Sequence, residues 1–185
     1  MAAQTISEHL RAAMRLAGRQ PQAVEEFANT PETAWFSFLA AFVALPLFLL
    51  VMATGAVKEG TEIIQLVADL GPYAVGWLLF PVVMLRVAPA MQCEQYYCRY
   101  IAAVNWCAVV EFIVMTGLVV LEAAGLIPEQ LARFLFVGLV VWVLTYQHFV
   151  AREALRIDGI QAAMLVALRM ALDLGIVAVS GLLGG

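Results

Sequence analysis

Residues 34–54 read AWFSFLAAFVALPLFLLVMAT and contain no charged side chain. A helix of about twenty apolar residues covers the roughly 30 Å hydrocarbon core of a bilayer. Four more apolar runs follow, at about 63–87, 100–121, 131–150 and 160–183. The sequence therefore predicts an all-α polytopic membrane protein, with five transmembrane helices in one membrane domain over residues 34–185.

The composition of the whole chain supports this class. Of its 185 residues, 64% are hydrophobic and 13% charged, whereas ordinary soluble domains are about 45–50% apolar and about 25% charged. The mean hydropathy is +0.91. A net charge of −4 offers no general basic surface, so we expect the lipid bilayer as a partner and no nucleic acid.

Residues 1–33 are more polar, and we expect them to form a cytoplasmic region without a removable signal peptide. Apolar side chains recur at helical spacing from Thr5 to Ala17, which predicts an amphipathic helix on the membrane surface. Three arginines would face lipid headgroups on its polar side: Arg11, Arg15 and Arg19. A short solvated helix packed on the spans explains the pattern equally well. The next segment, NTPET, predicts an N-cap at Thr30 and the start of the first span at Pro31.

The ten Lys and Arg residues are unevenly divided between the two sides of a five-span chain. Seven lie in the N-terminal region and in the second and fourth loops, two lie on the other side at Lys58 and Arg133, and Arg169 lies in the last span. Because cytoplasmic loops carry the excess of positive charge, we expect the N-terminus in the cytoplasm and the C-terminus outside. The favoured location is a bacterial inner membrane.

Motifs of known chemistry are missing from the sequence. The segment CEQYYC, residues 93–98, has neither a zinc nor a thioredoxin spacing, so we expect three free thiols at Cys93, Cys98 and Cys107. We interpret His148 as a hydrogen-bonded side chain at the end of the fourth span. No nucleophile elbow, zinc-protease motif, phosphate loop or dinucleotide fingerprint occurs. We therefore predict no catalytic residue, metal or cofactor; an enzyme built on residues 93–100 is the least favoured class.

Four polar residues fall deep inside the predicted spans. Glu111 lies about 16 Å into the third span, and Arg169 lies about 14 Å into the fifth from the same face. Asp173 follows one turn further out, and Asn105 lies one to two turns nearer the cytoplasm. A charge at this depth costs about 2.5–3.5 kcal/mol on the insertion scale. These residues are therefore candidates for a polar or ion site near the midplane.

This midplane group has two interpretations. In the first it is structural: Arg169 bridges Asp173 within its own helix and Glu111 across to the third span, which fixes how the helices pack. In the second it is functional, because one arginine and two ionised carboxylates leave a charge of −1. A protonated carboxylic acid, a bound cation or a water-filled cavity could neutralise that charge.

The fifth span also carries a stripe of small residues on the face opposite to Arg169. Small side chains at every fourth position let two helix backbones approach closely. The stripe predicts that this span is a central helix of the bundle or the seam of a homodimer. Its members are Ala163, Ala167, Ala171 and Gly175.

The segment DLGP, residues 69–72, resembles the D-L-Y-G-P signature of the Yip1-like membrane proteins, without the tyrosine and at the start of the second span. The five spans, the cytoplasmic N-terminal region and the short outer tail also resemble the layout of that family. The resemblance implies a five-span topology and a family linked to membrane traffic in eukaryotes. It implies no functional residue.

Two functions remain in competition at the level of sequence. The favoured one is a non-enzymatic membrane protein that organises or regulates a membrane complex, with Glu111, Arg169 and Asp173 as a buried polar network. The alternative is a small proton- or ion-coupled transporter or channel subunit in which Glu111 exchanges a proton. In that case, breaks at Pro46, Gly71-Pro72 and Pro81 would supply discontinuous helices.

Overall fold

The computed structural model describes residues 5–59 and 70–183, and every regular element in these ranges is helical. The predicted all-α class is confirmed. Five of the described segments are long and apolar enough to cross a membrane. Residues 63–69, the predicted start of the second span, and Asp69 of the DLGP segment lie outside the described residues. The five segments are Pro31–Thr54, Leu70–Ala90, Glu94–Ala123, Glu129–Leu155 and Gly159–Gly181.

The first span consists of α2 (Pro31–Ser37) and α3 (Leu39–Glu59), with a local break at Phe38. The Thr30 hydroxyl accepts a hydrogen bond from the N–H of Thr33 at 3.3 Å, and Pro31 occupies the first helical position. The predicted cap at Thr30 and the predicted helix start at Pro31 are thus confirmed. Proline fits at this position because its missing N–H would have no helical partner there.

The helix breaks expected at Pro46 and Pro81 are wrong. Helix α3 continues through Pro46, and α5 (Leu70–Ala90) continues through Pro81. Gly71 and Pro72 lie in the first turn of α5, directly after residues outside the described ranges, so the break expected there stays a prediction. A proline inside a helix removes one backbone donor and crowds the preceding turn. Apolar membrane helices tolerate this because neighbouring groups satisfy the freed carbonyl. Discontinuous helices at Pro46 and Pro81 therefore give no support to a transporter.

The polar loops are shorter than their composition predicts. Helix α5 extends to Ala90, a short 3-10 helix η2 (Glu94–Tyr96) leads into α6 (Tyr97–Ala123), and α7 (Glu129–Leu155) extends well past the predicted end of the fourth span. Helix α8 (Gly159–Leu183) follows after a tight turn at Arg156, whose φ of +56° is left-handed. Hydropathy marks the length that lipid can cover, whereas helical hydrogen bonding continues into the polar ends.

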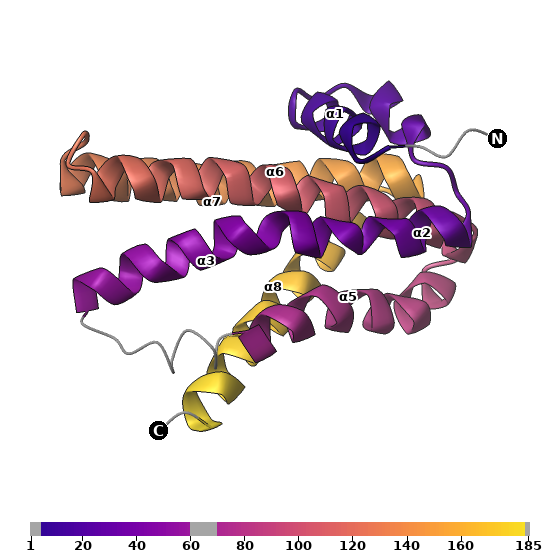
Figure 1. Ribbon diagram of the computed structural model, residues 1–185. Helices are drawn as coiled ribbons and strands as arrows, with labels where there is room; N and C mark the ends of the chain where they lie inside the picture. Colours follow the sequence, from indigo (N-terminus) through magenta and orange to yellow (C-terminus); the bar gives the residue numbers. More distant parts are fainter. Residues whose placement is uncertain (1–4, 60–69, 184–185) are drawn as a thin grey trace.

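The helices form two groups, which Figure 1 shows from the side. Helices α3, α6 and α7 lie alongside one another, while α5 and α8 contact each other below them. Contacts from α6 to α7, α7 to α8, α8 to α5 and α5 to α6 close a ring. The two ends of the described chain lie at opposite ends of this bundle (Figure 1). That placement agrees with an odd number of crossings.

Helix α6 is the centre of the molecule. In the apolar part of α6, 44% of the residues are buried, whereas in the apolar part of α8 only 11% are. The expectation that the last span is the central helix of the bundle is therefore wrong for the single chain. Small side chains around α6, such as Ala102, Ala103 and Ala108, let several helices approach it, and these residues are buried.

The N-terminal region packs on the bundle. Helix α1 (Ile6–Ala17) lies across α6 and α7, followed by the 3-10 helix η1 (Pro21–Glu26) (Figure 1). The buried His9 ring stacks on Trp106 with centroids 5.5 Å apart, and the Tyr146 hydroxyl donates to the Ala13 carbonyl at 2.7 Å. Two apolar side chains of α1, Ile6 and Met14, remain exposed. Of the two sequence interpretations, these contacts favour packing on the bundle.

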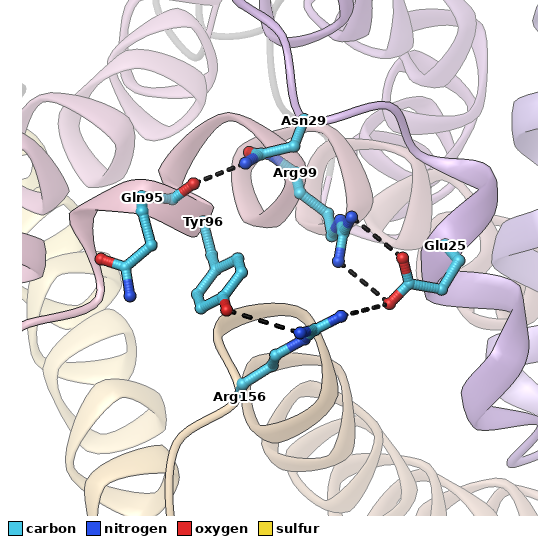
Figure 2. Close-up of polar contacts among 6 residues, drawn as sticks. All are labelled: Glu25, Asn29, Gln95, Tyr96, Arg99 and Arg156. Carbon is cyan, nitrogen blue, oxygen red and sulfur yellow. Dashed lines mark hydrogen bonds and ion pairs between the residues drawn. The ribbon is translucent and has the colours of Figure 1, made fainter.

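A carboxylate joins three segments at one end of the bundle, as Figure 2 shows. Glu25 of η1 accepts hydrogen bonds from Arg99 of α6 at 3.0 Å and from Arg156 at 3.1 Å. The Arg156 guanidinium also lies over the Tyr96 ring, 5.1 Å from its centroid. The group of Glu25, Arg99, Arg156 and Tyr96 is called the Glu25 cluster below. It links three segments whose basic residues predict the same side of the membrane.

Asn29 caps α6 from a distance in the sequence. Helix α6 has no side-chain cap from its own N-cap residue, Tyr96. Instead, the Asn29 Oδ1 accepts a hydrogen bond from the N–H of Arg99 at 3.0 Å, and its Nδ2 donates to the Gln95 carbonyl at 2.5 Å (Figure 2). The start of the central helix is therefore tied to the N-terminal region.

Candidate functional site

A cavity of about 840 Å³ lies among the helices, and all five candidate spans contribute to its wall. Most of the lining side chains are apolar, as is typical of pockets that bind small molecules. The polar residues on the wall are Tyr73, Asn105, Glu111, Gln147, Arg169 and Asp173. All four predicted midplane residues therefore line one cavity.

Glu111 has its nearest polar partner on α7. The Gln147 side-chain amide donates to both carboxylate oxygens, at 3.1 and 3.3 Å. Side chains lean toward the N-terminus of their own helix. In the antiparallel pair α6 and α7, the two long side chains therefore lean toward each other from different levels. This reach allows Gln147, near the end of the span, to meet Glu111.

Arg169 does not form the expected ion pairs. Within the described residues, no carboxylate oxygen lies within 4 Å of its guanidinium. The guanidinium instead lies over the Phe80 ring, 5.5 Å from the centroid. The cavity lies between α8 and Glu111, and an arginine that precedes an aspartate by four residues has the less favourable order for a helical ion pair.

Asp173 and Asn105 occupy different parts of the wall. Asp173 is exposed on α8, one turn from Arg169. Asn105 is buried, and its amide donates to the Ser37 hydroxyl at 2.9 Å; that hydroxyl donates in turn to the Ala34 carbonyl at 2.6 Å. Asn105 thus holds α6 to α2 as well as lining the cavity. The structure brings Glu111, Arg169 and Asp173 to one space and gives Asn105 a separate partner.

Gln147 and Tyr73 are the wall residues that the sequence analysis missed. Gln147 is a neutral amide near the end of a predicted span, and a residue of this kind is not marked by charge in the sequence. Its position four residues after Val143 and eight after Leu139, both on the wall, would have put it on the same helix face. Tyr73 follows Gly71-Pro72, which suggested a break, and its hydroxyl donates to the Ala41 carbonyl at 2.5 Å.

The three arginines expected at lipid headgroups differ in their surroundings. Arg15 pairs with Glu26 and donates to Gln20. Arg19 donates to the carbonyl and the hydroxyl of Thr145, at 2.6 and 2.8 Å. Arg11 is exposed, and among the described residues it has no ion pair. A headgroup role stays a prediction, and of the three Arg11 has the side chain most available for it.

The small-residue stripe of α8 lies on the outside of the molecule. Its four residues are exposed, and an added Cβ on Gly175 would meet nothing within 4 Å. Ala163 and Ala167 line a second, smaller pocket of about 400 Å³, beside Thr145 and His148 of α7. Close packing of α8 against another helix of this chain is thus not the role of the stripe. The seam of a homodimer stays a prediction.

The remaining candidate residues have structural surroundings. The His148 Nε2 lies 2.9 Å from the Gly159 carbonyl, which confirms a hydrogen-bonded histidine and ties α7 to the start of α8. The three thiols are free, and burial raises the pKa of Cys93. No group of three or more His, Cys, Asp or Glu side chains in the described part of the chain could hold a metal ion.

Comparison of the chain with protein-family models, with curated proteins and with solved structures gives no match. The resemblance to the Yip1-like proteins therefore stays a prediction.

Proposed function

We propose that this chain is a non-enzymatic membrane protein that binds a small amphipathic molecule in the central cavity and acts as a small carrier or carrier subunit. The observation that carries the proposal is the cavity of about 840 Å³, with Glu111, Arg169 and Asp173 on an otherwise largely apolar wall. Pockets of about 300–1,000 Å³ with a few polar groups are typical of small-molecule sites.

The contacts of the polar residues support binding over packing. A packing network would bring Arg169 onto Glu111, yet in the described residues each has a different neighbour: Phe80 for Arg169 and Gln147 for Glu111. Charged groups that face an intramembrane cavity instead of each other are typical of substrate or ion pathways. Carrier sites also lie near the middle of the bilayer, between helices.

We further infer that the five helices span a bacterial inner membrane, with the N-terminal region in the cytoplasm and the end of α8 outside. Five sufficiently long apolar helices and the uneven distribution of Lys and Arg support this orientation. The Glu25 cluster supports it as well, because it gathers the N-terminal region and both basic links at one end. Helix α1 would then lie at the cytoplasmic surface, with Ile6 and Met14 toward lipid.

Filling the cavity tests the proposal. Gly76 lines the cavity, and its added Cβ would lie 3.9 Å from Ile176, whereas Gly138 on α7 has open space outside the cavity. We therefore compare Gly76→Leu with Gly138→Leu as a matched control. The probe is a brominated octanol, an uncharged amphiphile that quenches the fluorescence of Trp77 on the cavity wall.

In bilayer nanodiscs we expect saturable quenching for the unmodified chain and for Gly138→Leu, and a much smaller saturable part for Gly76→Leu. A Trp77→Phe variant identifies the part of the signal that comes from the wall. Equal, non-saturating quenching in all four proteins would contradict a ligand-binding cavity. Ala108→Leu, which fills the same space from α6, serves as a second test if Gly76→Leu does not fold.

A second candidate, the organisation of a membrane complex, is favoured by the exposed stripe of Ala163, Ala167, Ala171 and Gly175. Helix pairs that associate in lipid use such stripes. Native mass spectrometry from nanodiscs should give a dimer that Ala167→Leu dissociates, while Val177→Leu on the cavity side leaves it intact. A monomer for the unmodified chain would contradict a homodimer through this stripe.

A further inference from the structure

The charge on the cavity wall is unbalanced. Its charged residues are Glu111, Asp173 and Arg169, which sum to −1 when all are ionised. Glu111 interacts electrostatically with both of the others. Its only hydrogen-bond donor among the described side chains, Gln147, is neutral. Among the residues that the structure describes, the wall therefore offers one more anionic group than it has cations.

Arg169, the one cationic side chain among the described wall residues, already has a neighbour. The Arg169 guanidinium lies over the face of Phe80, where the electron-rich ring attracts a positive charge. No side-chain cation in the described ranges lies within 4 Å of Glu111 or Asp173. A bound cation would therefore meet two carboxylates without displacing an existing ion pair.

Aromatic rings form a large part of the same wall. Tyr73 is their centre: its ring centroid lies 4.5 Å from that of Phe48, 6.1 Å from that of Trp77 and 6.3 Å from that of Phe112. All four residues line the cavity. Aromatic faces next to carboxylates recognise organic cations, because the rings attract the charge and cover the apolar substituents. A small hydrated metal ion would make no use of these rings.

We propose that the cavity binds an organic cation with a bulky apolar body. Its positive centre would lie near Glu111 and Asp173, and its apolar groups would lie against Tyr73 and the three aromatic rings around it. This inference rests on the proposed binding function and names its ligand class. An apolar anion would face two carboxylates and find only Arg169. The excess negative charge and the aromatic wall together favour the cation.

Two ions of nearly equal shape and opposite charge test the inference: tetraphenylphosphonium and tetraphenylborate. Binding to the full chain in nanodiscs is measured by equilibrium dialysis, with empty nanodiscs subtracted. We expect saturable binding of the phosphonium and at least about tenfold weaker binding of the borate, because a single charge changes sign in a low-dielectric site. Equal binding of both ions, or preference for the borate, would overturn the assignment.

Charge variants locate the effect. Glu111→Gln should weaken phosphonium binding on the order of tenfold, and Arg169→Gln should strengthen it, because the two substitutions change the wall charge in opposite directions. Glu129→Gln is the matched control, since Glu129 pairs with Arg133 at the far end of α7. An unchanged affinity in a folded Glu111→Gln protein would contradict a cation held at this carboxylate.

The outcomes separate the inference from the function on which it rests. If Gly76→Leu abolishes the binding of both ions while neither is preferred, the cavity binds amphipathic molecules and only the cation assignment fails. If neither ion nor the brominated alcohol binds in a manner sensitive to Gly76→Leu, the binding function fails too. Preference for the phosphonium together with loss in Gly76→Leu supports both.

Discussion

The Gln147 amide donates to both carboxylate oxygens of Glu111, at 3.1 and 3.3 Å, across the interface of α7 and α6. The hydrogen-bond partner of Glu111 on the cavity wall is thus a neutral amide and not Arg169. A neutral donor orients the carboxylate without cancelling its charge. This arrangement leaves Glu111 able to interact with a ligand in the cavity.

Replacing Gln147 with Leu should therefore destabilise the fold. The substitution leaves the Glu111 oxygens without their donor, which costs about 1–3 kcal/mol. Unfolding by sodium dodecyl sulfate in mixed micelles measures the change. Adding Glu111→Leu should restore much of the loss, because removing both partners of a hydrogen bond is less costly than removing one. Strictly additive losses in the double variant would show that the two side chains do not interact.

The buried pair of Asn105 and Ser37 predicts a second loss of stability. Ser37→Ala removes the acceptor of the Asn105 amide, and an unsatisfied buried donor costs about 1–3 kcal/mol. Ser180 supplies a matched control, because among the described residues its hydroxyl donates to the Ile176 carbonyl of its own helix. Ser180→Ala should change the free energy of unfolding by less than about 0.5 kcal/mol. Similar losses in both variants would contradict a specific role for the pair.

Asn29 should control the order of the first turn of α6. Asn29→Ala removes the cap on the N–H of Arg99, for which about 1 kcal/mol is typical. Hydrogen exchange should become faster at residues 98 and 99. Asn29→Asp keeps the accepting oxygen and places a negative charge at a helix N-terminus, so it should retain the protection. Fast exchange in Asn29→Asp would mean that the bond to the Gln95 carbonyl matters more.

The start of α1 should depend on pH through Glu8. A hydrogen bond from the Thr5 backbone N–H, at 2.7 Å, holds the pKa of the Glu8 carboxyl below its ordinary value of 4.5. Because the folded pKa is lowered, the carboxylate stabilises α1 fully above pH 4.5, and this contribution is lost as the pH falls through the folded pKa.

Hydrogen exchange across α1 between pH 6 and pH 3 measures this loss, with Glu8→Gln compared at each pH. Glutamine keeps an accepting oxygen in a capping box but does not titrate. We expect protection in the unmodified chain to exceed that of Glu8→Gln above pH 4.5 and to approach it at the acid end. Parallel profiles over the whole range would contradict a stabilising role for the ionised carboxylate.

The proposed orientation predicts which loops are accessible from outside. Leu126 lies in the turn between α6 and α7 and is 70% exposed, and Gln20 is exposed beside η1. In a background without the three native cysteines, a membrane-impermeant maleimide should label Leu126→Cys in intact bacterial cells. Gln20→Cys should react only after the membrane is opened. The opposite pattern would reverse the topology.

Apolar length and helix class could be predicted from the sequence because each crossing needs its own run of apolar residues. The cap at Thr30 was equally predictable, since the signal is local. The ends of α5, α6 and α7 were not, because helices continue through polar residues such as Arg152 once lipid no longer limits them. Pro46 and Pro81 likewise predicted breaks that α3 and α5 do not have.

The candidate site was predicted in part. Depth along each span put Glu111 and Arg169 at one level, and both line the same cavity. The depth of a residue along its span does not give its distance from residues on other helices. The expected ion pair between Arg169 and Glu111 therefore could not be tested by depth alone, and it does not form. The partners Gln147, Phe80 and Ser37 depend on which helices are neighbours, and that information lies in tertiary packing. For the same reason α6, and not α8, is the central helix.

The five helices that line the cavity are synthesised one after another. Helices α3, α5, α6 and α7 leave the ribosome before α8 and already contain Glu111 and Gln147. Arg169 and Asp173 lie on α8, the last of the five helices to be synthesised. A charged residue costs about 2.5–3.5 kcal/mol to insert at the centre of a membrane helix. In the proposed orientation, α8 therefore inserts beside a polar wall that Glu111 and Gln147 already provide, and this wall gives its two charged residues an alternative to lipid.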